Sequence, residues 1–323
     1  MTTSRRRSSG SGEHRVPAHD FHAPVLLEQA MSYLIERDGL YLDGTVGGGG
    51  HAEAILARCP GCRVLAVDRD TEALDAARER LSFGADRVVF ARMSFRVAPR
   101  HPLVREEKLA GALLDLGVSS HQLDHRHRGF TFRRGARLDM RMDQSTPPSA
   151  ADYLAEAPRD ALARALREGQ APRPAAVAAR IVRRRASRPF ATSDDLVAVL
   201  EAVLRRRAGH AEKARLFQAL RIRVNDEIGA LTDGLPAIRD ALRPGGVFVG
   251  ISYHSVEDAI VKRAFRDWSD PSHGLPPRLP VRAADLEPLG RVLTKKPVTA
   301  PPGETEVNPR ARPARLRAWR KAA

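Results

Sequence analysis

Four consecutive glycines, Gly47–Gly50, stand where this chain of 323 residues is best suited to hold a ligand. They follow a short apolar segment that ends at Asp43, and an apolar helical pattern begins directly after them. Glycine lets the backbone adopt positive φ angles and lets a ligand lie against bare main chain. A strand, a glycine turn and a helix N-terminus in this order predict a nucleotide-binding corner, with a purely structural turn as the alternative.

Asp68 strengthens the ligand-binding interpretation. Residues 63–68 read as a second buried strand, and this acid ends it. An acid in that position is placed to accept hydrogen bonds from both hydroxyls of a ribose, although it could instead cap a helix. The acid ahead of the glycines, Asp43, is not part of the dinucleotide fingerprint Gly-x-Gly-x-x-Gly. The arrangement resembles instead the first motif of S-adenosylmethionine (SAM) methyltransferases, in which the loop packs on the methionine part of the ligand.

Polar side chains also end two later strands. Residues 110–115 and 247–252 read as strands, and Asp115, Tyr253 and His254 lie at their carboxyl ends. The loops that follow residue 115 are too polar and irregular to belong to a core. Since α/β sheets carry out their chemistry at the carboxyl ends of their strands, we expect these side chains to surround a site.

The elements that must position these residues follow from hydrophobic periodicity. Strand and helix patterns alternate along residues 39–115, which predicts an α/β fold with a parallel sheet. Apolar residues at helical spacing then continue from about residue 150 to 213 without a strand. We therefore expect three parts: a disordered tail at 1–18, a sheet domain at 19–125 and 214–323, and an all-helical insertion at 126–213.

The charge balance points to a polyanionic partner. The chain has 54 basic and 39 acidic residues and a formal net charge of +15. A basic, arginine-biased proteome is the alternative explanation. Two arginine runs, Arg183–Arg185 and Arg205–Arg207, lie in the predicted insertion and would be either phosphate contacts or solvated faces. No apolar run is long enough to span a membrane, and the polar N-terminus does not read as a signal peptide.

Cysteine and histidine patterns do not predict a metal. Two cysteines in a chain of this length favour a reducing, cytoplasmic setting, and Cys59-Pro-Gly-Cys62 reads as a turn between helix and strand rather than a redox motif. Zinc would need further ligands. His121, His125 and His127 stand among arginines, and their spacing favours a solvated basic loop.

Several long motifs in one order resemble a single family, the bacterial small-subunit ribosomal RNA cytosine-N4 methyltransferases (the RsmH or MraW family), over about residues 19–321. The motifs are His22-Ala-Pro-Val-Leu-Leu, Asp43-Gly-Thr-Val-Gly-Gly-Gly-Gly-His51, Asp115-Leu-Gly-Val-Ser-Ser-His-Gln-Leu-Asp124, Arg128-Gly-Phe-Thr-Phe, Leu138-Asp-Met-Arg-Met-Asp143, Phe217-Gln-Ala-Leu-Arg-Ile-Arg-Val-Asn225, Ser252-Tyr-His-Ser-Val-Glu-Asp258 and Asn308-Pro-Arg310. The resemblance implies a class I, Rossmann-like SAM-dependent sheet, with the insertion as the RNA-recognition domain.

The resemblance also implies site residues. SAM contacts would fall on Gly49, Gly50, His51, Asp68, Phe95, Asp115 and Gln122, in addition to Gly47 from the loop pattern. The methyl acceptor would be the N4 amine of a cytosine in the decoding region of 16S rRNA, with free rRNA or the small ribosomal subunit as partner. The sequence leaves a homodimer open.

The expected reaction is in-line methyl transfer from a sulfonium to an amine whose lone pair is delocalised into the ring. Acceptors for the amine N–H bonds would localise that lone pair and later take the proton. Asp115 and Asp139 are candidate acceptors, and Tyr253 and His254 are candidates for stacking on the base and orienting it. The loop from Arg128 to Arg141 and the insertion would hold the flanking phosphates.

Two other functions remain open at this stage. A SAM-dependent methyltransferase of DNA cytosine or of a small molecule would share the cofactor loop, and a nucleotide-binding or RNA-binding scaffold without catalysis would share the fold and the charge. Preference for SAM over NAD in calorimetry would separate an enzyme of the expected kind from a dinucleotide-binding scaffold.

Overall fold

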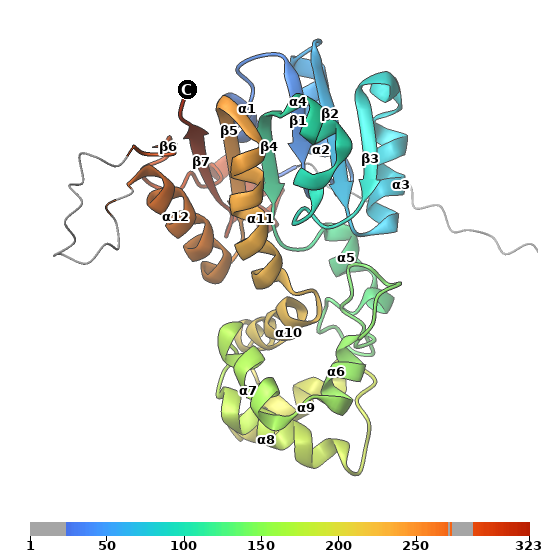
Figure 1. The fold of residues 1–323 in the computed structure, drawn as a ribbon. Coiled ribbons are helices and arrows are strands. Elements are labelled where there is room, and N and C mark those ends of the chain that lie inside the picture. The colour runs from blue at the N-terminus through green and yellow to red at the C-terminus, as the bar shows by residue number, and fades with distance from the viewer. Residues whose placement is uncertain (1–23, 271, 273–286) are drawn as a thin grey trace, which may run out of the picture.

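The computed structural model describes residues 24–270, 272 and 287–323 (Figure 1). The predicted tail at 1–18 and the start of the sheet domain at residue 19 lie outside the described residues. One sheet organises the described chain, with strand order β3-β2-β1-β4-β5-β7-β6. Its strands are β1 (Gly39–Asp43), β2 (Cys62–Asp68), β3 (Val88–Arg92), β4 (Leu109–Asp115), β5 (Leu242–Ser252), β6 (Gly290–Val292) and β7 (Arg315–Lys321).

The pairing of the strands confirms the α/β prediction. Strands β1 to β5 pair in parallel, whereas β7 runs antiparallel to both β5 and β6. A mixed seven-stranded sheet in this order is typical of class I methyltransferases. Because the strands are parallel, Asp43, Asp68 and Asp115, which end β1, β2 and β4, all lie at one edge of the sheet.

Helices cover both faces of the sheet, and each face has its own apolar core. Ile55 and Leu74 lie in the core on one face, together with residues of α1, while Leu235 and Phe265 lie in the core on the other. The helices around the sheet are α1 (Leu27–Leu34), α2 (Gly50–Arg58), α3 (Thr71–Arg80), α4 (Pro102–Glu107), α5 (Ser120–Asp124), α11 (Glu227–Ala241), α12 (Ser255–Ser269) and α13 (Pro302–Val307).

A separate helical region lies below the carboxyl edge of the sheet in Figure 1. Its helices are α6 (Ala150–Glu156), α7 (Arg159–Glu168), α8 (Pro174–Arg185), α9 (Ser193–Leu204) and α10 (His210–Val224). Phe217 and Leu220 of α10 are buried in the same apolar core as the residues of α7 and α8. The predicted end of the insertion at residue 213 therefore falls inside α10, since periodicity locates a helix but not the core that it joins.

Two of the arginines in the predicted basic run are structural. Arg184 donates to Asp195 at 2.6 Å, and Arg185 donates to the backbone carbonyl of Ala157 at 2.8 Å. Arg183 is exposed, as are Arg205 to Arg207. The first run is thus neither a simple solvated face nor three free phosphate contacts.

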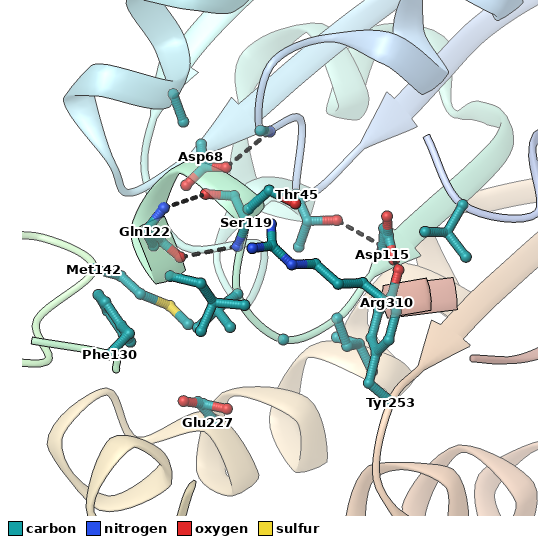
Figure 2. A pocket seen from close by; sticks show the side chains of 18 of the residues that line it. Thr45, Asp68, Asp115, Ser119, Gln122, Phe130, Met142, Glu227, Tyr253 and Arg310 are labelled. Atoms are coloured by element: carbon teal, nitrogen blue, oxygen red, sulfur yellow. Dashed lines mark hydrogen bonds between the residues drawn. The ribbon is translucent and has the colours of Figure 1, made fainter. Parts of the chain in front are cut away.

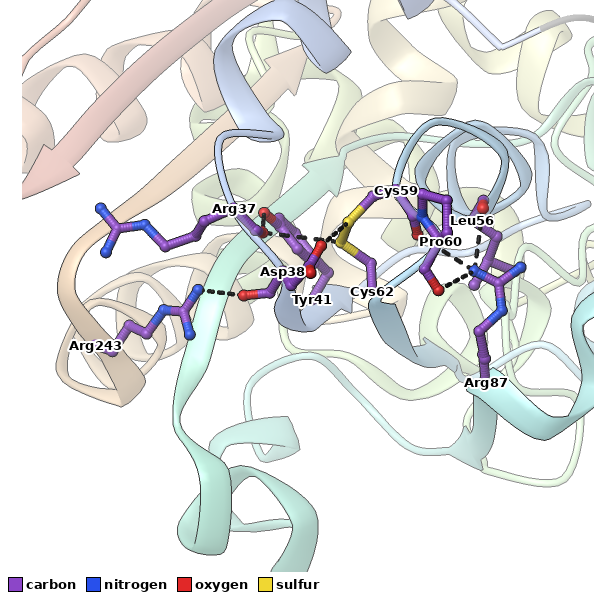
Figure 3. The surroundings of a disulfide bond; sticks show 9 residues. All are labelled: Arg37, Asp38, Tyr41, Leu56, Cys59, Pro60, Cys62, Arg87 and Arg243. Carbon is purple, nitrogen blue, oxygen red and sulfur yellow. Dashed lines mark hydrogen bonds between the residues drawn. A yellow bond between two sulfur atoms is a disulfide. The ribbon is translucent and has the colours of Figure 1, made fainter.

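Cys59 and Cys62 form a disulfide at the edge of the sheet opposite Asp43 (Figure 3). The predicted turn between helix and strand is present, because α2 ends at Arg58 and β2 begins at Cys62. The turn brings the two Cα atoms within 5.2 Å and the two sulfur atoms are bonded, which a reducing setting does not favour. Within the described ranges, the structure contains no helix that is both long and apolar enough to cross a membrane.

Candidate active site

A cavity of about 570 Å³ opens at the carboxyl edge of the sheet, where the strands meet the helical region (Figure 2). Residues from the glycine loop, from the ends of β2, β4 and β5, and from α10 and α11 line it. The structure therefore brings together Gly47, Gly50, His51, Asp68, Phe95, Asp115, Gln122 and Tyr253 from the predicted site.

The glycine loop has the backbone that its sequence predicts. Gly47 and Gly49 have φ angles of +51° and +84°, which side chains rarely permit. The Gly47 N–H donates to Asp68 Oδ2 at 3.0 Å, so the loop and the second strand are joined directly. Gly49 plays a packing role: a Cβ there would lie 3.3 Å from Ala77 Cα in α3, and Gly49 does not line the cavity.

Asp68 faces the cavity as an acceptor held by main-chain donors. Its second oxygen, Oδ1, accepts from the Asp70 N–H at 3.0 Å. Burial raises the pKa of Asp68 to about 6. Since each carboxylate oxygen can accept a second hydrogen bond, both remain able to receive hydroxyl donors.

Asp115 is the centre of a hydrogen-bonded group at the end of β4. The Tyr253 hydroxyl donates to Asp115 Oδ1 at 2.8 Å, and the Asp115 N–H donates to Thr45 Oγ1 at 2.7 Å. Burial raises the pKa of Asp115 to about 7 and that of Tyr253 well above its usual value. The phenol therefore stays a donor that orients the carboxyl group. Thr45 carried no role in the sequence-based prediction.

His51 presents a lone pair beside Asp115. Its Nε2 lies 3.1 Å from the Val25 carbonyl oxygen, which can only accept, so this nitrogen carries the proton. Burial lowers the pKa of His51 to about 4, and the ring is neutral. The unprotonated Nδ1 then lies 3.8 Å from Asp115 Oδ2. An amine or ammonium donor placed here meets two acceptors.

Asp43 lies beneath the loop and adds a further acid. It is 1% exposed, its Oδ2 has no hydrogen-bond partner, and burial raises its pKa to about 8. Three carboxyl groups, from Asp43, Asp68 and Asp115, thus gather at one edge with raised pKa values. Such a group suits a ligand that brings positive charge, because the ligand would stabilise the ionised forms.

Phe95 and Gln122 line the cavity but also hold the fold. A Cβ on Gly234 of α11 would come within 2.8 Å of the Phe95 ring, so the ring packs directly on that helix. Gln122 Nε2 donates to Asp70 Oδ2 at 2.7 Å, and its Oε1 accepts from the Ser119 N–H at 3.1 Å. The backbone of α5 is thereby fixed against the start of α3.

Arg128 and His121 are buried, which corrects two predictions. Arg128 is 0% exposed and forms ion pairs with Asp70 and Glu72, so it cannot reach an RNA phosphate. His121 is 2% exposed and its Nε2 lies 2.9 Å from Glu72 Oε2, so it is not part of a solvated loop. The His121 hydrogen bond and the Arg128 charge lower the pKa of Glu72 to about 2. Arg141 is likewise occupied, by Asp139.

Two predicted catalytic candidates stand apart from the cavity. Asp139 accepts two side-chain hydrogen bonds from Arg141, at 2.8 and 2.7 Å, and does not line the cavity. His254 caps α12: its Nδ1 accepts from the Glu257 N–H, and its Nε2 lies 3.1 Å from Glu257 Oε1. Both nitrogens of His254 therefore face protein groups.

A largely buried charged group that lines the cavity was missed from the sequence. Arg221 donates to both oxygens of Glu227, at 2.8 Å each, and lies 3.8 Å from Glu257. Glu227, Glu257 and His254 offer ligand atoms close enough together for a metal ion, as do Asp38, Cys59 and Cys62 elsewhere in the described chain. In the first group the Arg221 guanidinium already supplies the positive charge. The motif Phe217–Asn225, which contains Arg221, was visible in the sequence, but the sequence did not show which acids Arg221 would pair with.

Part of the cavity wall on the side of the helical region is apolar, beside the charged Arg221 and Glu227. Phe130, Phe132, Met142 and Phe217, all from the core of the helical region or packed against it, line the cavity there. Arg310, from the motif Asn308-Pro-Arg310, also lines the cavity. A polar half with acids and an apolar half with aromatic rings can accommodate two different ligands side by side.

Solved structures share only a distant likeness with this chain. An rRNA methylase from Streptococcus thermophilus matches at a TM-score of 0.41 and 11% identity, covering 92% of this chain and 94% of that chain. A methyltransferase from Streptococcus mutans in complex with SAH matches at a TM-score of 0.40 and 12% identity, covering 92% and 96%. Neither likeness is close enough to carry an argument.

Sequence relatives are much closer. A ribosomal RNA small subunit methyltransferase H from Gemmatimonas aurantiaca is 50% identical over 309 residues, covering 94% of this chain and 96% of the relative. A protein of the same name from Heliobacterium modesticaldum is 46% identical, covering 93% and 98%. The model of the MraW methylase family matches residues 19–322. With the cavity described above, these matches show that the chain belongs to the MraW methylase family.

Proposed function

We propose that this protein transfers a methyl group from SAM to the exocyclic N4 amine of a cytosine in the decoding region of 16S rRNA. The observation that carries the proposal is the Asp115 group: a carboxyl oriented by Tyr253 and facing an unprotonated His51 nitrogen, at the edge where the glycine loop opens. The names of the relatives, which match nearly the whole chain, support ribosomal RNA as the substrate.

The polar half of the cavity fits SAM. Asp68 would accept from the ribose hydroxyls, Phe95 would lie against the adenine, and the glycine loop would lie along the methionine part. The carboxyl group of Asp115 lines the cavity and suits the positive charge of the ligand, whereas Asp43 is 1% exposed, does not line the cavity and would act only through its charge. SAM supplies an electrophilic methyl group on a sulfonium, so the protein mainly has to align the acceptor.

The apolar half fits a cytosine that has left its stack. Phe130, Phe132 and Phe217 offer faces and edges for a flat base, and Asp115 would accept an N–H of its amine. This hydrogen bond localises the nitrogen lone pair and gives the proton a destination once the nitrogen becomes cationic. Tyr253 then acts by holding Asp115. The sequence had suggested instead that Tyr253 stacks on the base.

The helical region and the exposed arginines of the loop after α5 would bind the RNA backbone; these arginines are Arg126, Arg133, Arg134 and Arg137. Sequence-specific proteins usually read unpaired, splayed RNA bases, which a cavity between two domains admits. We infer a cytoplasmic enzyme that acts on free rRNA or on the small subunit. A homodimer remains a prediction that sedimentation of the purified protein would decide.

Mass spectrometry of rRNA nucleosides tests the proposed function in cells. Deleting the gene should remove a methyl group from N4 of a 16S rRNA cytosine, and the wild-type gene should restore it. Unchanged N4 methylation of 16S rRNA in the deletion strain would contradict the proposal, and a lost methyl group on DNA cytosine would favour the competing function.

Asp68→Ala should weaken SAM binding by about 10- to 100-fold. The loss corresponds to roughly 1.5–3 kcal/mol for hydrogen bonds to a charged acceptor. Isothermal calorimetry measures the change, and Asp75→Ala, an exposed acid of the neighbouring α3, is the matched control. An affinity equal to that of the wild type would remove Asp68 from the SAM site.

SAM affinity should also rise with pH between about 6 and 8.5. The pKa values of Asp68, Asp115 and Asp43 are about 6, 7 and 8 without ligand. A positive ligand favours the ionised carboxylates, so protons must be released on binding at low pH and the affinity falls there. S-adenosylhomocysteine lacks the sulfonium charge and should show a weaker dependence. Identical pH profiles for the two ligands would contradict this electrostatic account.

A further inference from the structure

Arg310 and Asp124 form an ion pair between segments that are far apart in the sequence. Arg310 lies in the turn η6 (Pro309–Ala311), and its Nη2 donates to both carboxylate oxygens of Asp124, at 2.8 and 3.0 Å. Asp124 is the last residue of α5. In Figure 2 the Arg310 side chain extends across the cavity. This pair thus ties the segment before β7 to helix α5, which carries Gln122 and is capped by Ser119.

The pairing leaves the guanidinium incompletely satisfied. A guanidinium binds an oxyanion best through two parallel N–H bonds from different nitrogens. Here one nitrogen makes both contacts, while Nη1 is shielded from solvent and has no hydrogen-bond partner. A shielded donor without an acceptor is costly, so Arg310 would gain from a partner that engages both nitrogens.

The backbone at Arg310 is fixed, whereas its side chain is partly exposed. Ala311 and Ala314 are both fully buried in the apolar core, and Asn308 Oδ1 accepts from the Arg310 N–H at 3.2 Å. The Arg310 side chain is 37% exposed. A change of partner therefore requires rotation of one side chain and no rearrangement of the fold.

Asp124 also has a second cation within reach. Arg133 Nη2 lies 3.7 Å from Asp124 Oδ1, and the Asp124 side chain is 38% exposed. Arg126, Arg134 and Arg137 are exposed in the same loop. If Arg310 turned away, Asp124 would keep Arg133, and the rim would present a cluster of positive charges to a polyanion.

We propose that Arg310 exchanges Asp124 for a backbone phosphate of the substrate RNA next to the target cytidine. A phosphate offers two oxygens to the guanidinium fork and would engage the nitrogen that Asp124 leaves unpaired. Asp124 holds Arg310 over the cavity until the RNA arrives. This inference rests on the proposed function. It adds a specific residue, Arg310, that would position the RNA strand relative to Asp115.

The salt dependence of RNA binding tests the exchange. Filter binding of a fragment of the 16S rRNA decoding region would be compared for the wild type, Arg310→Gln and Arg312→Gln. Arg312 is an exposed arginine next to the same turn and serves as the matched control. Arg310→Gln should weaken binding about tenfold and reduce the slope of log K against log salt by about 0.7 to 0.9. Calorimetry should show unchanged SAM affinity.

Asp124→Asn provides an independent test, because it removes the charge that holds Arg310 and leaves Arg310 in place. It should strengthen RNA binding in the wild-type background, and it should strengthen it less in Arg310→Gln, where only Arg133 and the added net charge remain to act. If Asp124→Asn weakens binding as much as Arg310→Gln does, the pair is only a structural clasp and the exchange is refuted. Equal losses in Arg310→Gln and Arg312→Gln would also refute it, since net charge alone would then explain the effect.

Failure of the proposed function and failure of the role of Arg310 give different results. A wild-type protein that binds the RNA with a normal salt slope but never methylates it would overturn the proposed function. An active wild type whose slope is the same in Arg310→Gln would overturn only the role of Arg310.

Discussion

Asp115→Asn should slow methyl transfer about 100-fold in a single turnover, at the low end of what positioned acid–base groups contribute. The Asp115 carboxyl accepts from the Tyr253 hydroxyl at 2.8 Å and faces the unprotonated Nδ1 of His51 at 3.8 Å. Asparagine keeps the size of the side chain but cannot accept the proton from the amine. The measurement is a rapid-quench assay with enzyme in excess over 16S rRNA or small-subunit particles at saturating SAM.

Two further variants make this result specific. Tyr253→Phe keeps the ring and removes the hydroxyl, so the rate should fall about tenfold, or about 1.4 kcal/mol of transition-state stabilisation. Asp139→Asn should change the rate less than threefold, because the Asp139 carboxylate is held by Arg141 outside the cavity. A slow Asp139→Asn beside a normal Asp115→Asn would move the amine acceptor to Asp139.

Arg128→Met should lower the free energy of unfolding by about 3–5 kcal/mol, the usual cost of removing one partner of a buried ion pair. Arg128 is 0% exposed, pairs with Asp70 and Glu72, and donates to the backbone carbonyl of Met142 at 3.1 Å. Methionine would fill part of the volume but would leave Asp70, which is 5% exposed, as an uncompensated charge.

Urea denaturation followed by circular dichroism measures this loss. Arg126→Met, in the same turn but exposed, should change the unfolding free energy by less than about 0.5 kcal/mol, as surface substitutions usually do. Equal effects of the two substitutions would mean that the buried pair contributes nothing beyond an ordinary surface arginine. A large loss at Arg128 alone would agree with the structure.

The arrangement of the sheet was predictable because it depends on local patterns. Each strand is a short apolar run, each crossover helix has apolar residues at helical spacing, and parallel strands bring their carboxyl ends to one edge. Asp68 and Asp115 therefore line one cavity together with the glycine loop, as expected. Glycine permits the positive φ angles at Gly47 and Gly49, but residue type does not place them, because Gly48 and Gly50 in the same run lack them.

Charge pairing was not predictable, because it depends on which elements pack together. Arg128 was expected to contact an RNA phosphate, yet it pairs with Asp70, and Arg310 pairs with Asp124. His254 reads as a catalytic residue beside Tyr253, but its helix cap turns both nitrogens toward Glu257. Periodicity likewise identified a helix around Phe217 without showing that it joins the helical core.

The most direct test of the account is methylation of 16S rRNA by the purified protein with SAM that carries a deuterated methyl group. Mass spectrometry of the digested RNA should find the label on N4 of a decoding-region cytosine, in an amount that rises with reaction time. The initial rate of labelling should fall about 100-fold with Asp115→Asn. Label on another atom or another nucleotide, or the same yield and initial rate from Asp115→Asn, would contradict it.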